Sequence, residues 1–207
     1  MHDQFQTFDS IKNVLRHNNE MLSMNKSHLS LLYFGFCNHL CSYMDAYKTL
    51  FNAGNYYVCK TIERAVLDLF IKARALCIAL NPEELARCML EKGKLNKDYL
   101  RPNTIKNCSI TKLCEYFDEQ DGNILLVDSV TGQKSGMLTN KYRDACKYVH
   151  PDVPCVWSYT TDTENNWYSL IRNDKEEFIQ LTSNIHVVLS QIFRLVFNQQ
   201  NGEQNAQ

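Results

Sequence analysis

SHLSLLYFGFCNHLCSYMDAYKTLF, residues 27–51, is the stretch of this chain that decides the fold. Its apolar and aromatic side chains recur at steps of three and four residues, the period of one face of an α-helix. Ser27 is the expected N-cap of this helix and Gly54 its expected stop. A second helix is predicted over 56–80, and the short link between the two favours an antiparallel hairpin.

The helical pattern continues on both sides of this hairpin. Further helices are predicted over 8–22, over 81–93 with Asn81 as cap and Pro82 at its first position, over 109–117, over 141–149 with Thr139 or Asn140 as cap, and over 173–197. Residues 124–137 have strand character, and we expect a small hairpin or an ordered loop there, inside an insertion spanning 119–138. The segment 152–166 is expected to be irregular, and residues 1–6 and 198–207 disordered. The predicted fold is an all-α antiparallel helical bundle in a single domain, residues 1–207.

Composition narrows the class of protein. The 22 basic and 23 acidic residues nearly balance, which excludes a uniformly basic nucleic-acid-binding surface but leaves a local basic patch open. Seven Gly and four Pro are few for a turn-rich β-sandwich or barrel. The start of the chain lacks the pattern of a signal peptide, and no stretch approaches the ~18 apolar residues of a membrane span. We therefore expect a cytoplasmic protein without a membrane segment.

The nine cysteines are an odd number spread along the chain, and most fall on apolar stripes. We interpret them as small buried hydrophobes in a reducing compartment. Cys37 and Cys41, with His39 between them, suggest a metal site, but His39 lies on another face of the helix and no second ligand pair exists. No phosphate-binding glycine loop or serine nucleophile elbow is present, and we expect neither a cofactor nor a metal.

Residues 141–151, KYRDACKYVHP, are the candidate for chemistry. On a helix, one stripe is expected to be buried: Tyr142, Ala145, Cys146 and Val149. The neighbouring stripe, at i, i+4 and i+7, consists of Arg143, Lys147 and His150. Because Pro151 disfavours helical geometry at the residue before it, His150 is expected at the C-terminal end of the helix. A cluster of Arg, Lys and His on one face suits an anionic ligand such as a phosphodiester.

This segment resembles the signature of the HEPN superfamily, an Arg followed by a polar residue and, after four to six residues, a His. Arg143-Asp144 and His150 match it, with six residues between Arg143 and His150. The helix that carries Arg64-x3-Asp68 also resembles the Arg-x3-acid helix of one HEPN-like subgroup of bacterial proteins. The likeness in layout covers 29–154, and its motifs cover only about a dozen positions.

The resemblance implies a small helical bundle and, for many members of the superfamily, a metal-independent RNase of toxin–antitoxin, phage-defence or RNA-processing systems. His150 would act as general base on a ribose 2′-hydroxyl or as general acid on the leaving 5′-oxygen. Arg143 would stabilise the phosphorane, Asp144 would orient one of these two residues, and Lys147 would bind the RNA backbone. The expected products are a 2′,3′-cyclic phosphate and a 5′-hydroxyl.

The expected partners are RNA, with tRNA as one candidate, a second copy of the chain that completes a composite site, and an antitoxin or regulatory protein. Two alternatives remain open: a non-catalytic HEPN-like module that binds RNA or a partner protein, and a helical scaffold unrelated to HEPN. In both, Arg143 and Asp144 can be a solvated helix surface, and His150 a helix cap. Arg64 and Asp68 would face inward near the motif in a HEPN-like bundle, although residues at this spacing more often form a surface ion pair.

Overall fold

The predicted pair of long helices forms the centre of the structure, a computed structural model. Ser27 caps α2 (His28–Asn52) as expected, its hydroxyl accepting the backbone N–H of Ser30 at 3.1 Å. Gly54, with φ at 74°, makes the left-handed turn that ends this helix. The side chain of Asn55 then caps α3 (Tyr56–Cys77), so a three-residue link folds the two helices back on each other.

The structure describes residues 5–22, 25–100, 109–122, 126–127, 134–149 and 164–204. Besides α2 and α3, its helices are α1 (Gln6–Met21), α4 (Pro82–Lys92), the short 3-10 helix η1 (Lys97–Tyr99), α5 (Ile110–Gln120), α6 (Met137–Val149) and α8 (Glu164–Gln204). The strands β1 (Leu126–Val127) and β2 (Lys134–Ser135) pair antiparallel, with Leu126 opposite Ser135. The predicted all-α bundle is confirmed. Of the two alternatives for 124–137, the pairing of these two-residue strands agrees with the hairpin.

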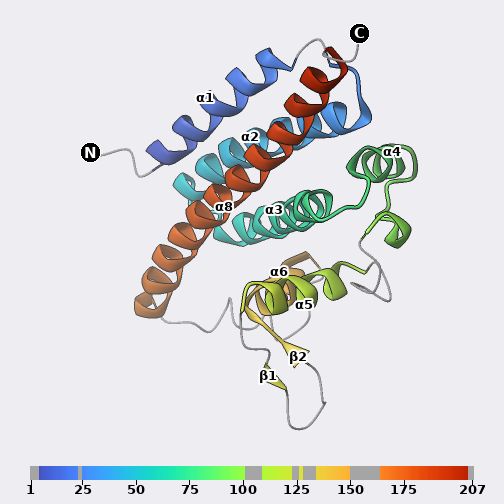
Figure 1. Ribbon diagram of the computed structural model, residues 1–207. Helices are drawn as coiled ribbons and strands as arrows, with labels where there is room; N and C mark the ends of the chain where they lie inside the picture. Colours follow the sequence, from blue (N-terminus) through green and yellow to red (C-terminus); the bar gives the residue numbers. More distant parts are fainter. Residues whose placement is uncertain are drawn as a thin grey trace.

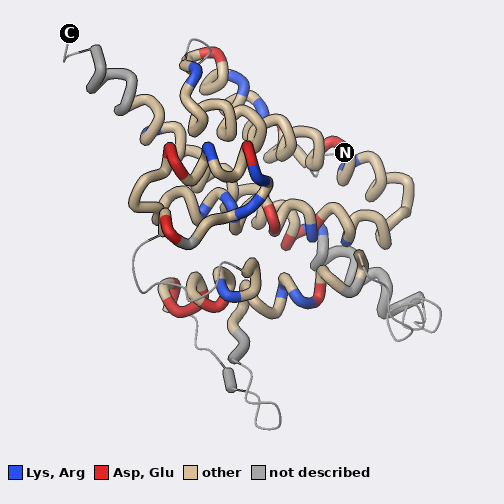
Figure 2. Tube along the Cα trace, turned by 90° about the vertical axis from the view of Figure 1, so that its right-hand side faces the viewer, with Lys and Arg blue, Asp and Glu red and all other residues tan. Residues whose placement is uncertain are grey.

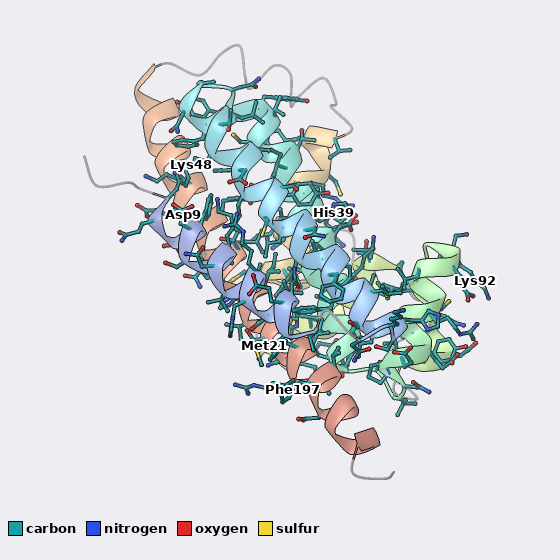
Figure 3. The ribbon with its side chains drawn as sticks, turned by 90° about the horizontal axis from the view of Figure 1, so that it is seen from above. Asp9, Met21, His39, Lys48, Lys92 and Phe197 are labelled. Atoms are coloured by element: carbon teal, nitrogen blue, oxygen red, sulfur yellow. The ribbon has the colours of Figure 1, made fainter. Side chains whose placement is uncertain are left out.

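The central position of α3 organises the bundle (Figure 1). α2 packs on one side of α3 and α6 with α5 on the other, while α8 packs on both α2 and α3, and α1 lies over α2 and α8. Figure 2, turned by 90°, again shows α5 and α6 below the longer helices. Seen from above (Figure 3), α1 lies along α2, Met21 lies toward the same end of the molecule as Phe197 of α8, and Lys92 marks the end of α4, set apart from both.

The core follows the predicted stripes and extends beyond them on α3. Leu40 and Met44 of α2 and Val66 of α3 are fully buried, as predicted. Residues of α3 outside this stripe are buried as well: Glu63 is 7% exposed, and Leu67, Ile71 and Ala75 are between 0% and 1% exposed. The reason is that α6 and α8 cover the face of α3 that a simple two-helix hairpin would leave in water.

Several helix ends differ from the predictions. Glu164–Gln204 is one continuous helix, so α8 begins before Asn173, and residues 198–204 are helical although they were expected in a disordered tail. An N-cap signal such as Asn-Asp tolerates helical geometry, and therefore it does not exclude further turns upstream. Phe5, expected in a disordered start, is 1% exposed and packs against Phe8. α5 continues to Gln120 and α6 begins at Met137, so the connection between them is shorter than the predicted insertion.

Other local predictions are confirmed. Asn81 caps α4 through the backbone N–H of Glu84, and Gly93, at φ 64°, ends it. Ser109 caps α5 through Lys112. Among the residues described, none of the helices combines the length and the apolar character that crossing a membrane requires.

Candidate functional site

The motif helix α6 packs antiparallel on α3. Tyr148 near the end of α6 contacts Tyr57 near the start of α3, with ring centroids 5.8 Å apart, and Tyr142 contacts Arg64 one to two turns further along. In the predicted buried stripe, Tyr142 and Ala145 are buried and Cys146 is half-buried. Val149 is 41% exposed, so that part of the prediction is wrong, because the last turn of α6 extends past the core.

The structure describes part of the predicted catalytic stripe. Arg143 is half-buried on the flank of α6, and Asp144 is exposed on its outer side. Lys147 lies in α6, but its side chain and the whole of His150 fall outside the described residues. The juxtaposition of Arg143 with His150 therefore stays a prediction.

Arg64 does reach the motif helix. Its guanidinium forms an ion pair with Asp68, with 2.9 Å between Nη1 and Oδ1, and Nε donates a hydrogen bond to Cys146 Sγ at 3.1 Å. Nη2 donates to the Tyr142 hydroxyl, and the guanidinium stacks on the Tyr142 ring with 3.9 Å from Cζ to the ring centroid. The Arg64 side chain is only 16% exposed. The pair of Arg64 and Asp68 is therefore not a simple surface pair: it holds Tyr142 and Cys146, the residues on either side of Arg143 along the buried flank of α6.

Burial and charge set the protonation of this cluster. Burial works against the charged form of Arg64, but the hydrogen bond to Cys146 and the charge of Asp68 outweigh it and raise the pKa of Arg64. Burial, followed by the charge of Asp68, raises the pKa of the Tyr142 hydroxyl to about 12. Burial, followed by the charge of Asp118, raises the pKa of the Cys114 thiol to about 12. At neutral pH, Tyr142 and Cys114 are therefore protonated, and neither provides an anionic nucleophile.

Asp118 of α5 contributes a contact that the sequence analysis missed. Its carboxylate is 0% exposed and accepts the backbone N–H groups of Leu138 and Thr139, at 2.8 and 3.0 Å, and the Thr139 hydroxyl at 2.7 Å. These groups belong to the first turn of α6, so Asp118 caps α6 from a different helix. The expected cap, Thr139 or Asn140, is wrong because both residues already lie inside α6.

A signal for Asp118 was present in the sequence. Leu113, Cys114 and Phe117 form the buried stripe of α5, and Asp118 continues it one turn after Cys114. A carboxylate in an apolar stripe needs donors for its oxygens. Its donors follow 20 and 21 residues later, beyond the range of a local capping pattern.

A separate hollow lies between α3, α6 and α8. It has a volume of about 140 Å³, an apolar floor that includes Leu67, Phe70 and Leu138, and walls that include Lys141 and Glu177. Lys141 and Glu177 form an ion pair at 3.2 Å, so the charges at this wall balance. Two residues along a helix are separated by about 200°. Lys141 and Arg143 therefore lie on opposite flanks of α6, and this hollow is not the site predicted for a phosphodiester.

The metal alternative finds no support among the described residues, where His, Cys, Asp and Glu side chains form no group of three or more that could hold a metal ion. Cys37 is buried, whereas His39 is exposed and stacks on Tyr43 with ring centroids 5.9 Å apart. His39 points away from α1 in Figure 3. Among the described cysteines, Cys37, Cys59, Cys88 and Cys114 are buried free thiols as predicted, whereas Cys41, Cys77 and Cys146 are half-buried.

Comparison with known proteins finds no match: no protein-family model, no curated protein and no solved structure is similar to this chain.

Proposed function

We propose that this chain is a HEPN-like, metal-independent endoribonuclease with Arg143 and His150 as its catalytic residues. The observation that carries the proposal is the Arg143-Asp144 pair on α6, followed in the sequence by His150; Arg64 anchors this helix in an all-α bundle. Anchoring matters because a catalytic guanidinium must stay within a fraction of an ångström of the charge it stabilises.

The reaction would begin with removal of the ribose 2′-hydroxyl proton, and His150 has the side chain suited to this step near neutral pH. The 2′-oxygen then attacks the adjacent phosphorus, and the bond from phosphorus to the 5′-oxygen breaks. The leaving 5′-oxygen takes up a proton, which gives a 2′,3′-cyclic phosphate and a 5′-hydroxyl. DNA would not react because it lacks the 2′-hydroxyl.

Arg143 would hold a non-bridging phosphate oxygen and stabilise the charge that builds up on the phosphorane. Its half-buried position strengthens such an interaction because the surrounding dielectric is lower than in water. Asp144 is exposed next to it and would orient Arg143 or His150, and Lys147 would bind the backbone of the RNA. Arg64 and Asp68 serve this site indirectly, since their described contacts hold Tyr142 and Cys146.

The proposed setting is a cytoplasmic toxin or defence system. A second copy of the chain would complete the active site, and an antitoxin or regulatory protein would control it. The nearly balanced charge argues against tight non-specific binding of RNA. We therefore propose a structured RNA such as tRNA as the substrate.

The test is incubation of the purified protein with total cellular RNA in EDTA. Arg143→Ala and His150→Ala are compared with the wild type, and Arg16→Ala and His17→Ala on α1 serve as matched controls of the same residue types. All variants are checked for intact helicity. We expect cleavage with cyclic-phosphate ends by the wild type and both controls, and cleavage slower by a factor of about 100 or more by the two motif variants.

Equal cleavage by all five proteins would overturn the assignment of the site. Absence of cleavage by the wild type, at protein concentrations where Arg143-dependent binding of RNA is measured, would replace the enzyme by the non-catalytic RNA-binding module.

A further inference from the structure

The start of α6 is fixed by a buried carboxylate from α5. Asp118 accepts three hydrogen bonds from Leu138 and Thr139, all between 2.7 and 3.0 Å. Gly136 makes this approach possible, because a Cβ at that position would lie 2.3 Å from Cγ of Asp118. The glycine immediately before α6 therefore has a steric role: it leaves the space that the carboxylate occupies.

A carboxylate that is 0% exposed is costly unless its oxygens find donors. The N-terminus of a helix supplies such donors, and its positive end favours an anion. Hydrogen bonds that a carboxylate accepts are short and directional. Asp118 therefore fixes where α6 begins along α5, which apolar contacts alone would do less strictly.

A second set of contacts fixes α6 about one turn further along, where Arg64 of α3 donates hydrogen bonds to Tyr142 and Cys146. Arg143 follows Tyr142 directly, and so its position depends both on the Asp118 cap and on the Arg64 contacts. A shift of α6 along its axis would move Arg143 by the same amount, and displacements of about 1 Å can cost a factor of about 100 in rate.

We propose that Asp118 is a positioning residue of the proposed ribonuclease: by capping α6 from α5 it sets the axial position of Arg143. This inference rests on the proposed function, but it also makes a structural claim that can be measured without activity. A purely stabilising cap would lower the free energy of unfolding and leave the folded site unchanged.

The kinetic test compares Asp118→Asn and Thr139→Val with the control Asp121→Asn. Asp121 lies three residues from Asp118, forms a bidentate pair with Arg74, and makes no described hydrogen bond to α6. Well below the unfolding temperature, we expect Asp118→Asn to lower kcat about tenfold or more with KM within about twofold. Thr139→Val, which removes one hydrogen bond and keeps the carboxylate, should lower kcat by a smaller factor, and Asp121→Asn should leave it unchanged.

A double-mutant cycle separates positioning from stability. In an Arg143→Ala background, Asp118→Asn should cause no further loss of kcat, because the group that it positions is absent. Equal losses in both backgrounds, or unchanged kcat in folded Asp118→Asn and Thr139→Val, would overturn the inference.

The structural test follows the ¹⁵N–¹H NMR signal of Arg64 Nε, which reports the hydrogen bond from Arg64 to Cys146. A shift of this signal in Asp118→Asn and in Thr139→Val, but not in Asp121→Asn, would show that α6 has moved relative to Arg64. An unchanged signal in both variants would overturn the inference. If the wild type cleaves no RNA, the proposed function fails, and the Arg64 signal still decides whether Asp118 sets the position of α6.

Discussion

The four helices α1, α2, α3 and α8 are joined mainly by apolar and aromatic side chains, whereas α5 and α6 are joined to them and to each other by charged groups as well. In the first region, Phe178 of α8 stacks on Tyr47 of α2 with ring centroids 3.7 Å apart and rings 4° from parallel, and its edge meets Phe8 of α1. In the second, Asp118 and Arg64 make the directional contacts to α6.

This difference teaches what each region contributes. Apolar packing supplies most of the stability of a domain, but it tolerates small changes in alignment. Hydrogen bonds to charged groups add less net stability and specify geometry more strictly. We therefore expect changes in the four-helix region to act on unfolding and changes around α6 to act on the candidate site.

The largest expected effect is at Phe178. Phe178→Ala removes a fully buried ring that joins α1, α2 and α8, and should lower the free energy of unfolding by about 3–5 kcal/mol. Urea unfolding followed by circular dichroism measures this. The control Val187→Ala, at a position 58% exposed on the same helix, should change it by less than about 0.5 kcal/mol. RNA cleavage per folded molecule should not change, and a cleavage loss in fully folded Phe178→Ala would break the comparison.

The next effect distinguishes two arginines of α3. Arg64→Met leaves Asp68 without its ion pair beside α6 and should lower the free energy of unfolding by about 2–3 kcal/mol. Arg74→Met removes a pair with Asp121, whose side chain is 44% exposed, and should cost about 1 kcal/mol. Both are measured by urea unfolding. Equal costs would mean that the Arg64 cluster is no more than an ordinary surface pair.

Tyr142 allows the α6 cluster to be tested by pH. The pKa of its hydroxyl is raised from 10.0 to about 12 in the folded state, by burial first and by the charge of Asp68 second. A raised folded pKa gives a contribution to stability that is fully present below about pH 10 and is lost as pH rises through about 12. Because burial raises the pKa of Tyr33 as well, phenolate absorbance should show at least two tyrosines fewer titrating near pH 10 in the wild type than in the unfolded chain. Tyr142→Phe should lose no titrating group in that range, and loss of one would contradict the assignment.

The smallest effect concerns a polar contact between α4 and α2, one of the helices of the four-helix region. Glu83 of α4 accepts the backbone N–H groups of His28 and Leu29 at the start of α2. Burial tends to raise the pKa of Glu83, but these hydrogen bonds, with that of the His28 ring, outweigh it and lower the pKa below 4.5. A lowered folded pKa gives stability that is present above the unfolded value and is lost as pH falls through the folded value.

Between pH 5 and pH 3, the free energy of unfolding of the wild type should therefore fall by about 0.5–1 kcal/mol more than that of Glu83→Gln. This energy is reduced to allow for the 31% exposure of the Glu83 side chain. Unfolding in urea at a series of pH values measures this difference. A steeper acid dependence in Glu83→Gln than in the wild type would contradict the assigned direction.

The sequence alone was enough to predict the helices whose signals are local. Ser27, Gly54, Asn81 and Gly93 mark helix ends through interactions within about four residues, and the apolar period of α2 selects its buried face. The Arg143-Asp144 motif was predicted from a family resemblance and from its place on one helix face. Its pairing with His150 is still a prediction, because His150 falls outside the described residues.

Only the tertiary structure decided which helices are buried on a second face, outside their apolar stripe, and which charged side chains contact other helices. Leu67, Ile71 and Ala75 are buried because α6 and α8 cover α3 on its far flank, and no period in α3 specifies which helices will arrive there. Arg64 meets Cys146 across 82 residues, and Asp118 caps α6 across 20. Helix periodicity and capping act over one or two turns of the chain, whereas these contacts depend on how whole helices are placed, which is set by packing of the entire core.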